Sequence, residues 1–166
     1  MKPMARLLIR VALVAFVTLG SLASGSAQGP AIDKAYMGRW KLNAEKSKWV
    51  SGTMPKELIR THEDRGNGFV IVWQDQVNAQ GVKTRTGYTY RPDGKPYPWA
   101  QMNATKLQTI SLTTTDPMTV DFRIFQDGVL TSTGHRVIAK DGKSMVITGA
   151  DADGQPGNTQ VFDRIQ

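Results

Sequence analysis

The chain of 166 residues carries 21 Lys and Arg against 14 Asp and Glu, a formal net charge of +7, and contains no Cys. Without Cys it forms no disulfide and performs no thiol chemistry, so packing alone must hold the fold together. The basic residues are interspersed with acidic ones along the whole chain, which argues against nucleic-acid binding. The length suits one domain and is too short for two.

Residues 1–27 have the three parts of a secretory signal peptide. Basic residues precede an apolar run over 11–22, and small residues follow it at Gly25 and Ala27. We predict cleavage between Ala27 and Gln28, which would make the protein periplasmic or secreted; a retained signal anchor is the alternative. The apolar run is shorter than the roughly 20 residues that a spanning helix needs, and no later segment reaches that length, so no transmembrane segment is expected after cleavage.

The rest of the chain has the pattern of strands and tight turns. After a flexible lead-in over 28–35, the first strand is expected over 36–42. An irregular stretch over 43–56 begins with a possible helical turn capped by Asn43. Turn sequences rich in Gly, Asn and Asp then separate segments rich in Val, Ile, Thr, Tyr and Phe. We expect these strands near 58–64, 69–77, 82–91, 106–114, 118–126, 129–139, 143–150 and 158–165, with a short further one near 95–101.

Strands in immediate succession predict an all-β fold, an antiparallel up-and-down barrel of about 8–10 strands, or a sandwich. Alternation places Val120 and Phe122 on the inner face. If Asp127-Gly128 forms a two-residue hairpin loop, Phe122 lies opposite Thr133 and Val120 opposite His135, so that His135 faces inward. A one-residue bulge would reverse this assignment. The same reasoning at the next turn pairs His135 with Thr148.

The opening Gly38-Arg39-Trp40 resembles the lipocalin signature and the related opening of fatty-acid-binding proteins. The resemblance implies that Trp40 packs across the closed end of the barrel and that Arg164, on the last strand, lies over it. Gly38, Trp40 and Arg164 would then form the structural base of the barrel. The longer segment 38–48 and the ending over 140–154 look like those of exported bacterial lipocalin-like proteins of the calycin type. This resemblance spans 36–165, assigns the domain to 36–166 and names no ligand.

A closed barrel of this size holds either its own side chains or one small ligand. The candidate cavity lining consists of aromatic residues and one histidine expected on inner faces: Trp73, Tyr88, Tyr90, Phe122 and His135. Arg85 and Arg136 are possible anchors for an anionic group, but their strand parity places them on the surface. Structural core is the competing interpretation for the aromatic residues.

Two histidines remain after cleavage, on different strands, and no Cys accompanies them, so we predict neither a metal site nor a cofactor. His62, Glu63 and Asp64 alternate between faces and are expected to form a solvated polar edge. No hydrolase or phosphate-binding signature occurs, so no catalytic residue is assigned.

We therefore predict an exported, non-enzymatic barrel that binds or carries a small hydrophobic or amphipathic molecule. One alternative is a plugged barrel that acts as a structural or interaction module of the cell envelope. Another is an isomerase or hydrolase with His135 or Asp75 as general base. The sequence specifies neither the ligand nor the oligomeric state.

Overall fold

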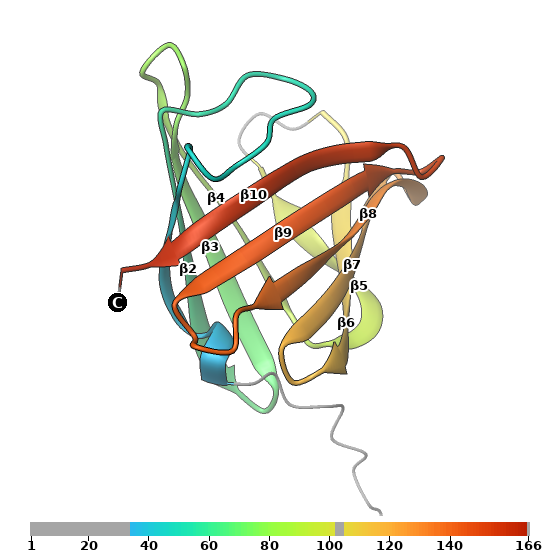
Figure 1. Ribbon diagram of the computed structural model, residues 1–166. Coiled ribbons are helices and arrows are strands. Elements are labelled where there is room, and N and C mark those ends of the chain that lie inside the picture. The colour runs from blue at the N-terminus through green and yellow to red at the C-terminus, as the bar shows by residue number, and fades with distance from the viewer. Residues whose placement is uncertain (1–33, 102–104, 166) are drawn as a thin grey trace, which may run out of the picture.

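The computed structural model describes residues 34–101 and 105–165, and these form a closed antiparallel barrel of ten strands (Figure 1). A short 3-10 turn, η1 (Lys34–Tyr36), precedes the first strand. The strands are β1 (Gly38–Leu42), β2 (Glu57–Gly66), β3 (Phe69–Val77), β4 (Lys83–Tyr90), β5 (Asp93–Ala100), β6 (Gln108–Asp116), β7 (Thr119–Gln126), β8 (Val129–Ile138), β9 (Ser144–Asp151) and β10 (Pro156–Arg164). The predicted all-β up-and-down barrel is confirmed. The signal peptide and its cleavage site at Ala27 and Gln28 lie outside the described residues.

Each strand pairs with the next one along the chain, and β1 closes the barrel against β10. Connections therefore alternate between the two ends of the barrel. The end called here the mouth carries residues 43–56, 78–82, 101, 105–107, 127–128 and 152–155; the other end, called the base, carries η1 and the remaining described turns. In Figure 1 the cyan and green loops of the mouth project upward, and the blue η1 lies at the base.

One aromatic and one cationic side chain close the base. Trp40 is fully buried, and its indole N–H donates to the carbonyl of Tyr36 at 3.1 Å. The Arg164 guanidinium lies 4.0 Å from the centre of the Trp40 ring and donates to the carbonyls of Met37 and Gly142, each at 2.6 Å, and to that of Ala35. The structure thus brings Trp40 and Arg164 together at the barrel base. Gly38 begins β1 with φ 107°, a left-handed conformation that favours glycine.

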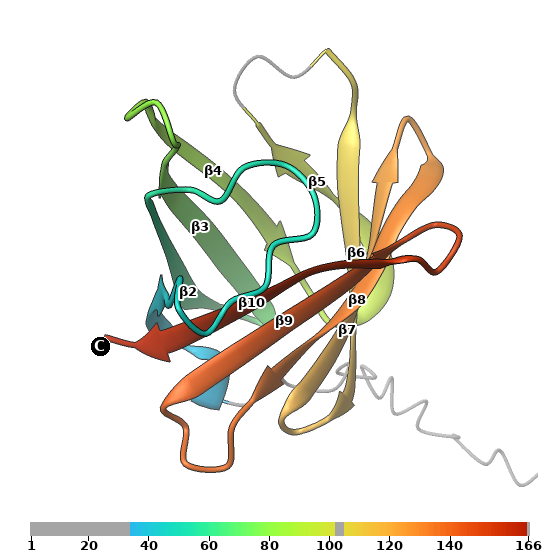
Figure 2. The same cartoon turned by 45° about the horizontal axis from the view of Figure 1, so that its top comes forward.

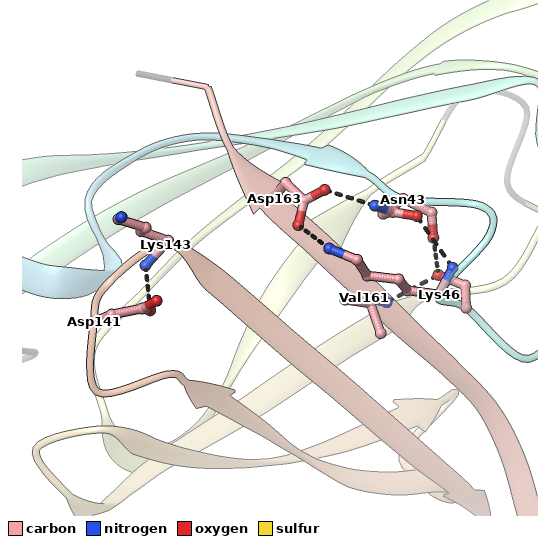
Figure 3. Close-up of polar contacts among 7 residues, drawn as sticks. Asn43, Lys46, Asp141, Lys143, Val161 and Asp163 are labelled. Carbon is pink, nitrogen blue, oxygen red and sulfur yellow. Dashed lines mark hydrogen bonds and ion pairs between the residues drawn. The ribbon is translucent and has the colours of Figure 1, made fainter.

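The loop over 43–56 crosses the mouth and is fixed to β10 at several points (Figures 2 and 3). Asn43 donates from Nδ2 to Asp163 at 2.7 Å, and the Lys46 ammonium lies 3.3 Å from the other Asp163 carboxylate oxygen. Lys48 and Thr159 exchange two backbone hydrogen bonds of 2.8 Å. The expected helical turn at Asn43 is a single hydrogen-bonded turn, in which the Asn43 side chain accepts from the Lys46 amide. The loop is therefore an ordered part of the barrel.

A one-residue bulge between β7 and β8 changes which residues face inward. Asp127 and Gly128 have φ of 51° and 82°, the two positive values of a type I′ turn, and Gln126 pairs with Val129 as a two-residue hairpin loop requires. The register then shifts, and Thr131 has no residue paired with it across β7 and β8. Consequently Phe122 lies opposite Gly134, not Thr133, and Val120 lies opposite Arg136, not His135. The predicted pairing of His135 with Thr148 is confirmed, but the prediction that His135 faces inward is wrong.

Candidate functional site

Two arginines lie buried inside the barrel and share one tyrosine hydroxyl. Arg60 on β2 is 5% exposed and Arg136 on β8 is 3% exposed. Their guanidinium groups donate to the hydroxyl oxygen of Tyr88 on β4 at 3.0 and 2.5 Å. Arg60 also donates to Oε1 of Gln74 on β3 at 3.3 Å. Residues from four strands thus converge on one point in the interior.

The buried charge of these arginines has no counter-ion in the described part of the chain. Among the described residues no Asp or Glu is buried, whereas Arg60, Arg136 and His62 are. Burying a cation without an acidic partner is costly, because the protein interior solvates charge poorly. The Tyr88 hydroxyl supplies a neutral acceptor only, so the net positive charge of the interior remains.

Several buried polar atoms around this pair have no hydrogen-bond partner among the described residues. They are Nε of Arg60, Nε of Arg136, Nε2 of Gln74 and both ring nitrogens of His62. The Tyr88 oxygen accepts from both arginines, and in the described part of the chain its hydroxyl donates no hydrogen bond. Buried polar groups in native proteins are nearly always paired. The excess of donors over acceptors therefore fits an anionic or carbonyl-bearing guest.

Burial and mutual repulsion perturb the titration of these groups. Burial lowers the pKa of Arg60 to about 10, with the neighbouring Arg136 acting in the same direction. Burial also holds the pKa of His62 well below its usual value, and the charges of Arg60, Arg136 and Arg164 lower it further. His62 is therefore neutral inside the folded barrel at neutral pH. An anion bound near the arginines would offset the repulsion from Arg136, which contributes to both shifts after burial.

A cavity of about 400 Å³ opens at the mouth, between the loop over 43–56 and the strands β7, β8, β9 and β10. Its lining combines apolar and neutral polar side chains, among them Val50, Phe122, Ile124, Ser132, Ile147 and Gln160, with one acidic residue, Asp151, at the end of β9. Arg136 adjoins this cavity at two points: it pairs across strands with Ile147, and its guanidinium lies 5.5 Å from the centre of the Phe122 ring. The cavity thus has a mixed apolar and polar lining, and Arg136 is a cationic neighbour of two of its lining residues.

Three of the five residues predicted to line a cavity do face the interior. Tyr88, Tyr90 and Phe122 are buried, and the rings of Tyr88 and Tyr90 lie 5.8 Å apart. Of the three, Phe122 lines the cavity, while Tyr88 accepts the hydrogen bonds of the two arginines. Burial raises the pKa of Tyr90, which stays protonated among its apolar neighbours.

Trp73 lies on the outer face, which corrects the prediction that it lines the cavity. It is paired across strands with Gly87, and a Cβ on Gly87 would come within 2.6 Å of the Trp73 ring. Because glycine has no side chain, the indole packs over Gly87 on the outer face of the barrel, where Arg85 lies 5.5 Å from the ring centre. Arg85 in turn forms a two-point ion pair with Asp75 at 2.6 and 2.8 Å, and this pair lowers the pKa of Asp75.

His135 also lies outside, in a surface hollow of about 440 Å³ over the outer face of β6, β7 and β8. Its Nδ1 is 2.8 Å from Asp121, and the side chain is 62% exposed. The hollow is separated from the interior by the sheet itself. His135 and Asp75, the two candidate general bases, are therefore both remote from the mouth cavity.

The residues that the sequence interpretation missed are Arg60, His62 and Arg136. His62 is 1% exposed, so the prediction of a solvated edge is wrong for this residue. The available signal was alternation: Arg60 and His62 share the face of the buried Leu58. No comparable signal existed for Arg136, because its face depends on the bulge at Thr131.

Within residues 34–101 and 105–165, no group of three or more His, Cys, Asp or Glu side chains could hold a metal ion. The same residues include no helix that is long and apolar enough to cross a membrane. The sole helical element described is η1, a single turn at the base.

Comparison with known proteins identifies the fold and no family. No protein-family model and no curated protein matches the chain. Among solved structures, a variant of the fluorescent protein UnaG matches with a TM-score of 0.56 and 13% identity over 80% of this chain and 97% of that one. Wild-type UnaG matches with a TM-score of 0.53 and 13% identity over 78% and 96%. At this identity the likeness is one of fold alone.

Proposed function

We propose that the barrel binds a small amphipathic anion, with its charged group at Arg60 and Arg136 and its apolar part toward the mouth. The observation that carries this proposal is the pair of buried arginines, with no buried acid among the described residues, next to a cavity whose lining is partly apolar. A buried charge that adds nothing to the fold is expensive to retain, so a ligand that neutralises it gives a reason for its presence. A carboxylate, sulfonate or phosphate oxygen would also satisfy the orphaned donors around Tyr88.

The same geometry favours binding over catalysis. Acid–base catalysis requires a titrating group within reach of the bound molecule. The two candidates for that role, His135 and Asp75, lie on the outer face of the barrel. His62 faces the interior, but burial, together with the charges of the surrounding arginines, opposes its protonation and keeps it neutral. We infer a carrier or binding protein that leaves its ligand chemically unchanged.

The test compares two dyes that differ by one charged group. Anilinonaphthalene sulfonate is an amphipathic anion, and N-phenyl-1-naphthylamine is the same ring system without the sulfonate. We expect the sulfonate to bind at least about tenfold more tightly, because one charge-assisted hydrogen bond is worth roughly 1.5–3 kcal/mol. Equal affinity for both dyes would show that the arginines do not contact the ligand, and no uptake of either would favour the plugged barrel.

Substitutions locate the binding site within the barrel. R60M and R136M should each remove the preference for the sulfonate while leaving binding of the neutral dye largely unchanged. R123M is the matched control, because Arg123 is an exposed arginine on β7, the strand that pairs with β8 and Arg136. Circular dichroism of each variant verifies that the barrel is intact. Mass spectrometry of the gently purified protein would then identify any molecule that remains bound.

We also propose that the protein is exported, on the signal-like pattern of residues 1–27. N-terminal sequencing of protein recovered from the periplasm or medium should begin at Gln28. Retention of Met1 on a membrane-bound product would instead establish a signal anchor.

A further inference from the structure

Exposed apolar side chains gather at the mouth. In the described residues the large exposed hydrophobic side chains are Val50, Val82, Leu107, Val129, Val137 and Ile165. The first four lie on or beside mouth connections, and each is at least 54% exposed. Scattered apolar residues on a surface need no explanation, but their concentration around the opening of a cavity does.

Lysines accompany the apolar residues on three neighbouring connections. We call residues 43–57, 78–83 and 105–107 the basic rim; it contains Lys46, Lys48, Lys56, Lys83 and Lys106 against Glu45 and Glu57. Lys46 is paired with Asp163. The other four ammonium groups have no ion-pair partner among the described residues and are exposed.

The remaining two connections of the mouth are acidic. Together with Asp151, the last residue of β9, they present Asp127 and Asp153 and no basic residue. Asp127 accepts a hydrogen bond from the amide of Leu107 at 3.0 Å, and Asp151 accepts from the amides of Asp153 and Gln155, so two of the three fix turn geometry. The mouth is therefore polarised: the four unpaired lysines and the exposed side chains of Val50, Val82 and Leu107 lie on one side.

The backbone of the basic rim is held in place. The Asn158 side chain accepts hydrogen bonds from the amides of Val50 and Ser51 at 2.7 and 3.1 Å and donates to the carbonyl of Ser51 at 3.2 Å. Val50 also lines the mouth cavity, so it is fixed at the edge of the opening. Figure 2 shows the loop reaching from β2 toward β10 across this end of the barrel. A preordered rim loses little conformational entropy when it binds.

We propose that the basic rim docks on a bilayer that contains anionic lipid, with Val50, Val82 and Leu107 inserted among the headgroups. Apolar side chains interleaved with lysines are the composition that binds such interfaces. Each lysine near an anionic surface contributes roughly 1 kcal/mol, which is about fivefold in affinity. In this orientation the cavity opens toward the membrane. The proposal concerns the outer rim and does not require the anion site inside the barrel.

The absence of Cys allows a position-specific test in the full chain. The variants V82C, L107C and I165C are each labelled with an environment-sensitive nitrobenzoxadiazole dye; Ile165 is exposed beside the base and serves as the control. Vesicles of phosphatidylcholine and phosphatidylglycerol in equal amounts should shift the emission at positions 82 and 107 to the blue and leave position 165 unchanged. Comparing positions within one chain separates the rim from any contribution of residues 1–27.

Charge substitutions test the second half of the proposal. In the L107C reporter, K83Q together with K106Q should lower the vesicle partition coefficient by at least about tenfold, given the contribution of each lysine. Vesicles of phosphatidylcholine alone should give a much weaker shift. Equal shifts at positions 107 and 165, or none with anionic vesicles, would overturn the proposal; in the latter case an acidic protein becomes the partner to seek. Dye binding inside the barrel, measured without vesicles, is unaffected by either result.

Discussion

Arg164 on β10 is the cross-strand partner of Trp40 on β1, and its guanidinium covers the indole at 4.0 Å from the ring centre. The contact closes the base with one cation and one ring, and the guanidinium also satisfies carbonyl oxygens of the turn before β1. A cation over an indole is attracted by the ring's negative face. First and last strands are thus joined by a side-chain contact as well as by the ladder, which is what completes the barrel.

Replacing Trp40 should destabilise the protein strongly. W40A empties the largest fully buried position at the base and leaves Arg164 without its ring. We expect a loss of roughly 3–5 kcal/mol in the free energy of unfolding, measured by urea denaturation. A loss below about 1 kcal/mol would contradict the role of Trp40 in closing the base.

The strands and turns could be predicted from the sequence because their signals are local. Alternation over β7 and the turn Asp127-Gly128 each need only a few neighbouring residues. The contact of Trp40 with Arg164 joins distant residues, and it followed only from a family resemblance. Such a resemblance predicts which residues close the barrel base but not which side chains fill the interior.

Three physical reasons explain the errors in the predicted interior. One extra residue, Thr131, exchanges the inner and outer faces along β8, and alternation alone does not reveal a bulge. Charged residues are also expected at the surface, so Arg60 and His62 were not read as core despite sharing the parity of Leu58. Trp73 was wrongly predicted to face inward, because Gly87 has no side chain and so leaves room for a large ring on the outer face.

Adding one methyl group at Gly134 should be costly. A Cβ there would overlap the backbone carbonyl of Thr148 and come within 2.5 Å of the Phe122 ring. A carbonyl in a β-ladder cannot move aside, so G134A should lower the free energy of unfolding by about 1–3 kcal/mol or more. G149A is the control: its Cβ would find no atom nearer than 3.6 Å, and we expect a change within about 1 kcal/mol. Equal losses in thermal or urea unfolding would refute this steric account.

The arginine pair and its tyrosine should respond to substitution in opposite directions. Y88F removes the acceptor that Arg60 and Arg136 share, so the unliganded protein should lose about 1–3 kcal/mol. R60M replaces an uncompensated buried cation by an apolar chain of similar length, so its stability should be unchanged or higher, by up to roughly 4 kcal/mol. Urea denaturation of the dye-free proteins compares the two. A large loss in R60M would mean that Arg60 serves the fold rather than a ligand.

His62 should make the folded state less stable as the pH falls. Its pKa is well below the usual value in the folded barrel, whereas in the unfolded chain it titrates near 6.5. The unfolded state therefore takes up a proton that the folded state refuses, so the contribution of neutral His62 is fully present above pH 6.5 and is lost below it. Between pH 7.5 and 5 this amounts to a loss of up to about 2 kcal/mol.

Urea denaturation across that pH range, compared between the wild type and two variants, tests whether His62 causes the loss of stability. H62L removes the titrating ring, so its stability should fall less with decreasing pH than that of the wild type. V72A, at the residue paired with His62 across β2 and β3, removes buried apolar volume without removing a proton site. It should shift the whole curve downward in parallel with the wild type. If H62L keeps the full wild-type slope, other groups cause the acid sensitivity and His62 is not held neutral by burial and the neighbouring arginines.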